Sequence, residues 1–114
     1  MITLYGIKNC DTVKKARQWL DDHAIAYRFH DFRSDGLTPA QVQHFLTRCE
    51  WEVLLNRRST TWKALSETQK TDLNASAVIA LLVEHPTLIK RPVLESDDML
   101  LVGFNPDSYQ LALC

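Results

Sequence analysis

The sequence contains no pair of cysteines with CxxC spacing, because the residue three positions after Cys10 is Val13. The other two cysteines, Cys49 and Cys114, are too few and too distant for a disulfide framework. The four histidines are also scattered, so no metal-ligand spacing is present and no metal is expected. These absences favour reduced thiols and a cytoplasmic protein.

An excess of one sign of charge is also missing, since 13 Lys and Arg residues stand against 14 Asp and Glu residues. This balance argues against direct binding to nucleic acid, which needs a surplus of basic residues. No stretch approaches the roughly 20 apolar residues of a membrane span, and "MITLYGI" lacks the features of a signal peptide. We therefore expect a monomeric single domain, residues 1–114, with no membrane contact.

The first part of the chain predicts a strand, a helix and a second strand. Residues 2–7, "ITLYGI", are apolar and β-branched, as in a short buried strand. From Asp11 the apolar residues recur with helical spacing, and residues 24–32, "AIAYRFHDF", alternate as in a strand. Strand, helix and strand within about thirty residues is the pattern of a parallel βαβ unit.

Helical signals dominate the middle of the chain, over about residues 37–87. Thr38 and Gln41 have the spacing of a capping box at a helix start. The unbroken apolar run 77–83 predicts a helix that is buried almost all round, and Pro86 ends it.

Residues 88–104 return to strand character on both sides of the polar turn "ESDD", which predicts an antiparallel hairpin. Asn105 and Pro106 then cap a closing helix. The order β-α-β, helical insert, β-β-α fits an α/β fold of the thioredoxin type. Its mixed four-stranded sheet would combine both halves, with the insert of about 37–87 between them.

The position of Cys10 predicts a reactive thiol, because this cysteine lies between the end of the first predicted strand and the start of the first predicted helix. Unpaired backbone N–H groups and the helix dipole favour negative charge there, and nearby lysines add positive potential. Only the thiolate is a good nucleophile, so Cys10 is the predicted catalytic residue. The alternative is a small packed side chain, which is what most free cysteines are.

The positions of the other two cysteines do not indicate a catalytic role. Cys49 falls late in a helical segment and is expected to pack, whereas the terminal Cys114 is the candidate for a distant resolving thiol. A phosphatase loop would need an arginine six residues after Cys10, and Ala16 occupies that position.

Arginines suited to carboxylates, oxyanions and thiolates occur at Arg57-Arg58 and at Arg91, although exposed arginines often only solvate a surface. Pro92 begins the third predicted strand, where a thioredoxin-like fold places a cis-proline beside the active cysteine. In that fold Arg91 would also lie near Cys10.

Several motifs, in order along the whole chain, resemble the arsenate reductase ArsC/Spx family and within it the bacterial YffB-like branch. They are "LYGIKNCDTVKKARQWL", "YRFHDFRSDGL", "LLNRRSTTWK", "IKRPVL" and "LVGF". The resemblance implies a thioredoxin-like fold with a helical insert. It also implies that Cys10 is the nucleophile, as in the glutaredoxin-coupled arsenate reductases of this family.

In those reductases three arginines hold the oxyanion. Arg91 matches one of them, and the Arg57-Arg58 pair supplies another, with Arg58 preferred because Ser59 and Thr60 follow it. The third has no counterpart, since no Arg or Lys follows Arg91. A multiply charged oxyanion needs dense positive donors, so this loss should weaken arsenate binding.

The resemblance to the YffB-like branch therefore favours a monothiol oxidoreductase that depends on glutathione as co-substrate, with no tightly bound cofactor. The residues expected to bind substrate or glutathione are Lys8, Asn9, Asp11, Thr12, Arg58, Arg91 and Pro92.

Two alternatives remain. One is a glutaredoxin-coupled arsenate reductase, whose partner would be glutaredoxin. The other is an Spx-like regulatory protein that binds RNA polymerase; it would lack the CxxC switch, since Val13 replaces the second cysteine.

Overall fold

A computed structural model of the chain describes residues 2–97 and 99–114. It divides into two compact units. The first consists of the residues up to Asp35 together with Arg91–Cys114, and the second is Gly36–Lys90. The second unit thus lies close to the bounds predicted for the helical insert. That all 114 residues act as one domain stays a prediction.

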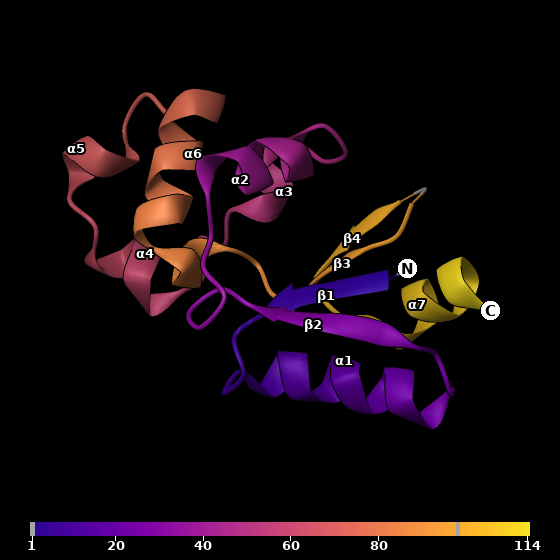
Figure 1. Ribbon diagram of the computed structural model, residues 1–114. Coiled ribbons are helices and arrows are strands. Elements are labelled where there is room, and N and C mark those ends of the chain that lie inside the picture. The colour runs from indigo at the N-terminus through magenta and orange to yellow at the C-terminus, as the bar shows by residue number, and fades with distance from the viewer. Residues whose placement is uncertain (1, 98) are drawn as a thin grey trace. The chain divides into compact units, whose positions relative to one another are not determined.

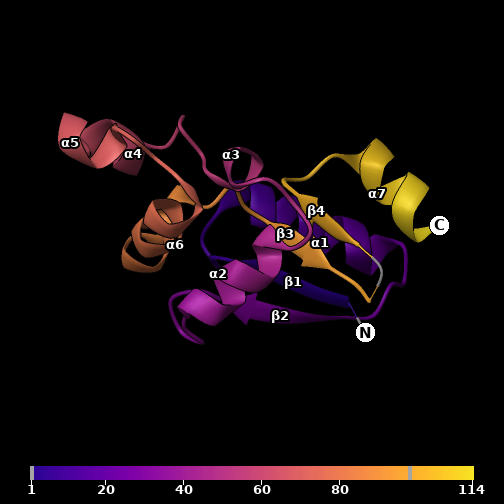
Figure 2. The same cartoon turned by 90° about the horizontal axis from the view of Figure 1, so that it is seen from above.

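The first unit contains a four-stranded mixed sheet with the order β2-β1-β3-β4 (Figure 2). Its elements are β1 (Ile2–Gly6), α1 (Asp11–Asp22), β2 (Tyr27–Asp31), β3 (Val93–Glu95), β4 (Leu100–Val102) and α7 (Pro106–Leu113). β1 pairs with β2 in parallel and with β3 antiparallel, and β3 pairs with β4 antiparallel. The predicted α/β fold, with its β-α-β and β-β-α halves, is confirmed.

One face of this sheet forms the core of the first unit with α1 and α7. Leu4 and Leu94 come from the sheet, Ala16 and Leu20 from α1, and Tyr109 from α7, and all five are fully buried. Figure 1 shows α1 running along β1 and β2, as the helical spacing of its apolar residues requires. Each large apolar side chain buried in this way contributes about 1.5–3 kcal/mol.

The second unit is helical. Its elements are α2 (Pro39–Leu46), α3 (Trp51–Leu54), α4 (Thr60–Ala64), α5 (Glu67–Lys70), α6 (Ala75–Glu84) and a 3-10 turn, η1 (Pro86–Leu88). The capping box at the start of α2 is confirmed, because the Gln41 N–H donates to Oγ1 of Thr38 and the Thr38 N–H donates to Oε1 of Gln41. These two bonds satisfy backbone donors that the helix itself leaves unpaired.

The prediction that the apolar run 77–83 is buried almost all round is wrong. Within α6 only Val78, Leu81 and Leu82 are buried, whereas Ala80 is exposed. In this unit the helix packs mainly on α2 and η1, so one apolar face meets most of its contacts. In the described part of the chain, no helix combines the length and the apolar character that crossing a membrane requires.

Candidate active site

Cys10 is the N-cap of α1, as its place in the sequence predicts. Its backbone is extended, with φ −93° and ψ 125°, and its carbonyl accepts a hydrogen bond of 3.0 Å from the N–H of Lys14. The Cys10 N–H donates to the Ile7 carbonyl at 3.1 Å, which closes a tight turn after β1. Its thiol is half-buried and makes no capping hydrogen bond. The sulfur is therefore held at the positive end of a helix and left available for reaction.

A buried carboxylate that sequence reasoning missed fixes the loop before Cys10. Oδ2 of Asp31, at the end of β2, accepts a 3.1 Å hydrogen bond from the Lys8 N–H. Oδ1 accepts 2.8 Å and 3.4 Å bonds from the N–H groups of Arg33 and Ser34. Burial alone would raise the pKa of the Asp31 carboxyl, but the hydrogen bonds from Arg33, Lys8 and Ser34 outweigh it and lower that pKa. Asp31 thus stays ionised and holds two loops together.

The predicted cis-proline is present, since the Arg91–Pro92 peptide bond is cis. β3 pairs with β1 through Tyr5 and Val93, and continuing that antiparallel register places Pro92 opposite Gly6. The start of β3 therefore lies at the same sheet edge as the turn that leads to Cys10. Nε of Arg91 is buried and has no hydrogen-bond partner among the described residues. A buried guanidinium N–H without a partner is a donor suited to an anionic ligand.

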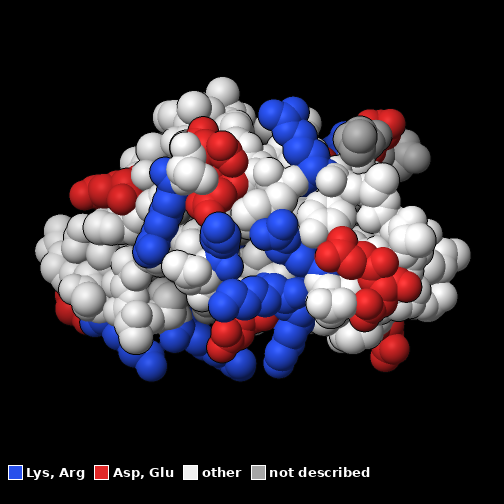
Figure 3. All heavy atoms as spheres, turned by 60° about the horizontal axis from the view of Figure 1, so that its bottom comes forward, with Lys and Arg blue, Asp and Glu red and all other residues white. Residues whose placement is uncertain are grey.

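The other residues predicted around Cys10 are exposed on the turn and the first turn of α1. Lys8 and Asn9 precede the cysteine, and Asp11 and Thr12 follow it. Lys14 and Lys15 are exposed one turn further on. Figure 3 brings the side with α1 forward and shows Lys and Arg side chains gathered there beside acidic groups.

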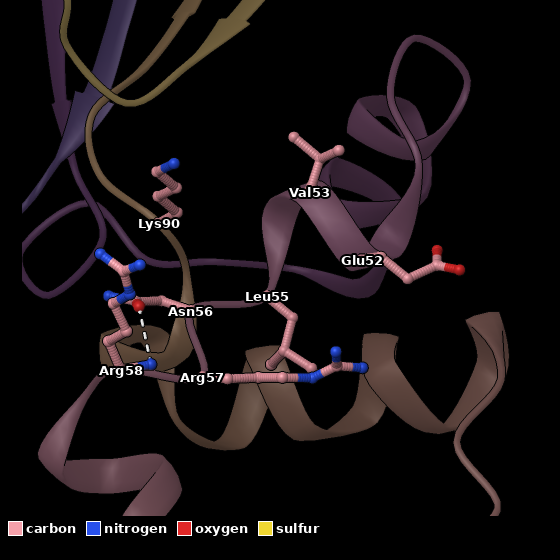
Figure 4. Close-up of a pocket in the computed structure, with 7 residues that line it drawn as sticks. All are labelled: Glu52, Val53, Leu55, Asn56, Arg57, Arg58 and Lys90. Carbon is pink, nitrogen blue, oxygen red and sulfur yellow. Dashed lines mark hydrogen bonds between the residues drawn. The ribbon is translucent and has the colours of Figure 1, made fainter.

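Arg58, the remaining predicted binding residue, belongs to the second unit. It lines a pocket of about 410 Å³ together with Glu52, Val53, Leu55, Asn56, Arg57 and Lys90 (Figure 4). Among the predicted binding residues, the structure brings Lys8, Asn9, Asp11 and Thr12 together with Cys10 in the first unit. Arg91 and Pro92 directly precede β3, the strand next to β1, and Arg58 has different neighbours.

The pocket in the second unit is built on two paired segments. Leu55 and Ile89 form an antiparallel bridge, the Asn56 N–H donates to the Leu88 carbonyl at 2.7 Å, and the Lys90 N–H donates to the Leu54 carbonyl at 2.8 Å. Sequence reasoning missed Lys90, because this pairing joins it to residues more than thirty positions away.

Arg57 and Arg58 have different surroundings. The Arg57 guanidinium carbon lies 5.7 Å from the centre of the Trp51 ring and 5.9 Å from the centre of the Trp62 ring, so both tryptophans hold this cation. The Arg58 N–H donates a 3.0 Å hydrogen bond to Oδ1 of Asn56, which fixes the backbone while the side chain stays exposed.

All three cysteines are free. Cys49 is half-buried, and burial, followed by the charge of Glu50, raises the pKa of its thiol. Cys114 is exposed at the chain end. Within residues 2–97 and 99–114, no three His, Cys, Asp or Glu residues are grouped so that they would hold a metal ion.

The sequence model of the ArsC family matches residues 5–112. This chain belongs to the ArsC family. The match covers both units, including the turn with Cys10 and the strand that follows Pro92. The resemblance deduced from the sequence motifs is thereby confirmed.

Individual relatives agree with this membership. The chain is 52% identical to an uncharacterized protein of Haemophilus influenzae, with 98% of each chain covered. It is 30% identical to the global transcriptional regulator Spx 1 of Lactococcus lactis, over 99% of this chain and 89% of the regulator. The solved structure of the YFFB (PA3664) protein matches over the full length of both chains, with a TM-score of 0.96 and 46% identity. ArsC and Spx proteins are therefore both relatives, and a thiol oxidoreductase-like family is supported.

Proposed function

We propose that this protein is a glutathione-dependent thiol oxidoreductase of the cytoplasm in which Cys10 is the nucleophile. The observation that carries the proposal is the position of Cys10 as the N-cap of α1, with a thiol that no capping hydrogen bond occupies. The backbone N–H groups of the first helical turn stabilise a negative charge on sulfur at that position. Membership of the ArsC family also supports a thiol-dependent reductase.

The proposed reaction has two thiol–disulfide exchanges. The Cys10 thiolate first attacks the glutathione sulfur of a mixed disulfide, so that a Cys10–glutathione disulfide forms and the substrate leaves as a thiolate that takes up a proton. A second glutathione thiolate then attacks this disulfide, releasing the Cys10 thiolate and oxidised glutathione. One substrate disulfide is reduced, and two glutathione sulfurs are joined.

Arg91 is the residue proposed to support this step, from its position just before β3, the strand next to β1. Its unpartnered Nε–H can pair with a carboxylate of the peptide or with a thiolate. Backbone groups beside Pro92 would bind an extended peptide, and Lys8, Asn9, Asp11 and Thr12 would form the exposed rim around the sulfur.

The test is an assay in which glutathione reduces a glutathionylated peptide in the presence of the protein. The rate is measured from the release of the free peptide. Cys10→Ser should abolish the activity, whereas Cys49→Ser, which removes a thiol elsewhere in the chain, should leave it near the wild-type rate. Arg91→Gln should lower kcat/KM about tenfold or more, through the loss of a charge-assisted hydrogen bond. Equal activity of wild type and Cys10→Ser would overturn the proposal.

Arsenate reduction is the second candidate, because the chain belongs to the ArsC family. The scarcity of arginines weighs against it, since no Arg or Lys follows Arg91. Arsenate reduction with glutaredoxin, at a rate exceeding that of peptide deglutathionylation, would favour this candidate.

Regulation through RNA polymerase is the third candidate, and the 30% identity to an Spx regulator favours it. Recovery of RNA polymerase by Cys10→Ser as efficiently as by wild type, together with no reductase activity, would favour this reading.

A further inference from the structure

Exposed basic residues lie near Cys10 on three segments of the first unit. Lys8 belongs to the turn before the cysteine, Lys14 lies near the start of α1, and Arg33 belongs to the loop that follows β2. Figure 3 shows the side on which α1 lies, where basic side chains gather. In the described part of the chain none of the three forms an ion pair. Their charges are therefore available to a partner that approaches Cys10.

Hydrogen bonds of the backbone hold these three segments together. The buried carboxylate of Asp31 accepts a 3.1 Å bond from the Lys8 N–H through Oδ2 and a 2.8 Å bond from the Arg33 N–H through Oδ1. The Cys10 carbonyl accepts a 3.0 Å bond from the Lys14 N–H. The three basic residues thus start from a fixed frame close to one thiol.

Lys14 lies on the side of α1 that is turned toward β2. Arg17, three residues further on, shares that side. Its Nε donates to the Tyr27 hydroxyl at 3.1 Å, and its guanidinium carbon lies 4.3 Å from the centre of the Phe29 ring. Because β2 leads into the loop with Arg33, Lys14 and Arg33 lie toward the same side of the first unit.

The stability of α1 does not account for this distribution of charge. A helix dipole favours acidic residues at the start of a helix and basic residues at its end. The last turn of α1 instead carries Asp21 and Asp22 and no basic residue, while Lys14 and Lys15 lie nearer its start. Arg17 has the i, i+4 spacing to pair with Asp21, but its guanidinium packs on β2. The basic half of α1 is therefore better explained by a partner than by the helix itself.

We propose that this basic surface, formed by Lys8, Lys14 and Arg33, selects protein substrates whose cysteine is flanked by acidic side chains. The proposal rests on the function proposed above and names the class of substrate that meets Cys10. Carboxylates near the substrate cysteine pair with these cations as the sulfur approaches, which raises the rate of encounter. The formal net charge of −1 for the whole chain argues against nucleic acid as the partner.

Asp11 provides a change of opposite sign. It is an exposed carboxylate directly after Cys10, and among the described residues it forms no ion pair. The nearby Asp35 is engaged differently, because its Oδ2 accepts a 2.9 Å bond from the Asp31 N–H. Asp11 repels an acidic substrate, so Asp11→Asn should strengthen the preference that Lys8→Gln weakens. A surface that only holds the turn in place does not predict these opposite effects.

The experiment uses the full chain and two glutathionylated peptides of the same length. In one peptide two glutamates stand on each side of the cysteine, and in the other glutamines take their place. The readout is the ratio of kcat/KM for the two peptides, which cancels any change in the reactivity of Cys10 itself. Wild type should prefer the acidic peptide about tenfold at low salt, and the ratio should approach one at about 1 M salt.

Lys8→Gln, Lys14→Gln and Arg33→Gln should each lower this ratio about two- to fourfold, as expected for exposed charge pairs. Arg28→Gln is the matched control, because Arg28 is an exposed residue of β2 on the sheet face away from α1. Its neighbour Phe29 contacts α1, and successive side chains of a strand alternate between faces. This control should leave the ratio unchanged. A ratio near one for wild type, or an equal loss in Arg28→Gln, would overturn the assignment.

A peptide with serine in place of the cysteine separates this outcome from that of the proposed function. Titration of the isotope-labelled protein with the acidic serine peptide should shift the amide NMR signals of Lys8, Lys14 and Arg33, whereas the glutamine version should not. Such binding, with a Cys10→Ser variant as active as wild type, would refute the catalytic proposal alone. Activity that depends on Cys10, with equal kcat/KM for both peptides, would refute the substrate surface alone. Stronger inhibition by an oligonucleotide than by the serine peptide of equal charge would overturn the assignment to protein substrates.

Discussion

Gly6 at the end of β1 and Val13 in the first turns of α1 lie so close that no side chain fits between them. A Cβ atom on Gly6 would lie 2.7 Å from Cγ2 and 3.2 Å from Cγ1 of Val13. Val13 is fully buried, so its side chain has little room to adopt another rotamer. This approach of strand and helix sets the course of the turn, residues 7–10, that carries Cys10.

Gly6→Ala should therefore destabilise the protein by about 1–3 kcal/mol through overpacking. Urea unfolding monitored by circular dichroism measures the change. Val13→Ala opens the space that the new methyl group needs, so the double variant should be more stable than the sum of the two single changes predicts. Simple additivity would show that the contact with Val13 is not the cause.

Asp31→Asn should lower the free energy of unfolding by about 1–2 kcal/mol at neutral pH, since the loops at Lys8 and Arg33 lose a charged acceptor. The folded-state pKa of Asp31 lies below its ordinary value of 3.8, so its contribution is present above that value and is lost as the pH falls through the folded pKa. The difference between wild type and variant should therefore shrink in acid.

Urea unfolding at several pH values between about 7 and 2 tests this prediction. Asp21→Asn is the matched control, because Asp21 is exposed and none of its side-chain atoms makes a hydrogen bond in the described structure. A loss of stability for Asp31→Asn that stays constant down to the lowest pH would contradict the account.

Tyr109 is fully buried, and its hydroxyl has no hydrogen-bond partner among the described residues. Tyr109→Phe should leave stability unchanged or raise it by up to about 1 kcal/mol, because it removes an unsatisfied polar group and keeps the ring. Contacts of the ring with Trp19 and Phe104, whose centroids lie 5.5 and 4.9 Å away, would persist. Tyr109→Ala, by contrast, should cost about 3–5 kcal/mol.

The same residue predicts an effect of alkaline pH. Burial raises the pKa of the Tyr109 hydroxyl above its ordinary value of 10.0, so the folded state favours the neutral form of this side chain. Stability should fall as the pH rises above about 10, where the unfolded chain loses this proton. Tyr109→Phe should reduce that fall, and an identical alkaline loss in wild type and variant would contradict the assignment.

Local features of the chain account for what the sequence predicted correctly. The strand before Cys10, the helix that starts at Asp11 and the capping box of Thr38 depend on neighbours a few residues away. The cis bond before Pro92 followed from the fold type once the order of elements was clear.

Features that depend on tertiary pairing escaped prediction. Asp31 acts on a loop 23 residues earlier in the chain, and Lys90 joins Arg57 and Arg58 only through the bridge between Leu55 and Ile89. The exposed side of α6 escaped for a related reason. An apolar run in the sequence shows that a helix can be buried. It does not show how many sides of that helix other elements cover.

The reactivity of the three cysteines toward iodoacetamide, read by peptide mass spectrometry, tests the central claim most directly. Each cysteine in turn serves as a control for the others within one protein sample. Burial and the charge of Glu50 raise the pKa of the Cys49 thiol, so Cys49 should react slowly at neutral pH. Cys114 is exposed and provides a reference for a thiol at the chain end. Cys10 should be alkylated about tenfold faster than either at about pH 6.5, because the start of α1 stabilises its thiolate. Alkylation of Cys10 no faster than that of Cys114 would contradict the account of Cys10 as the nucleophile.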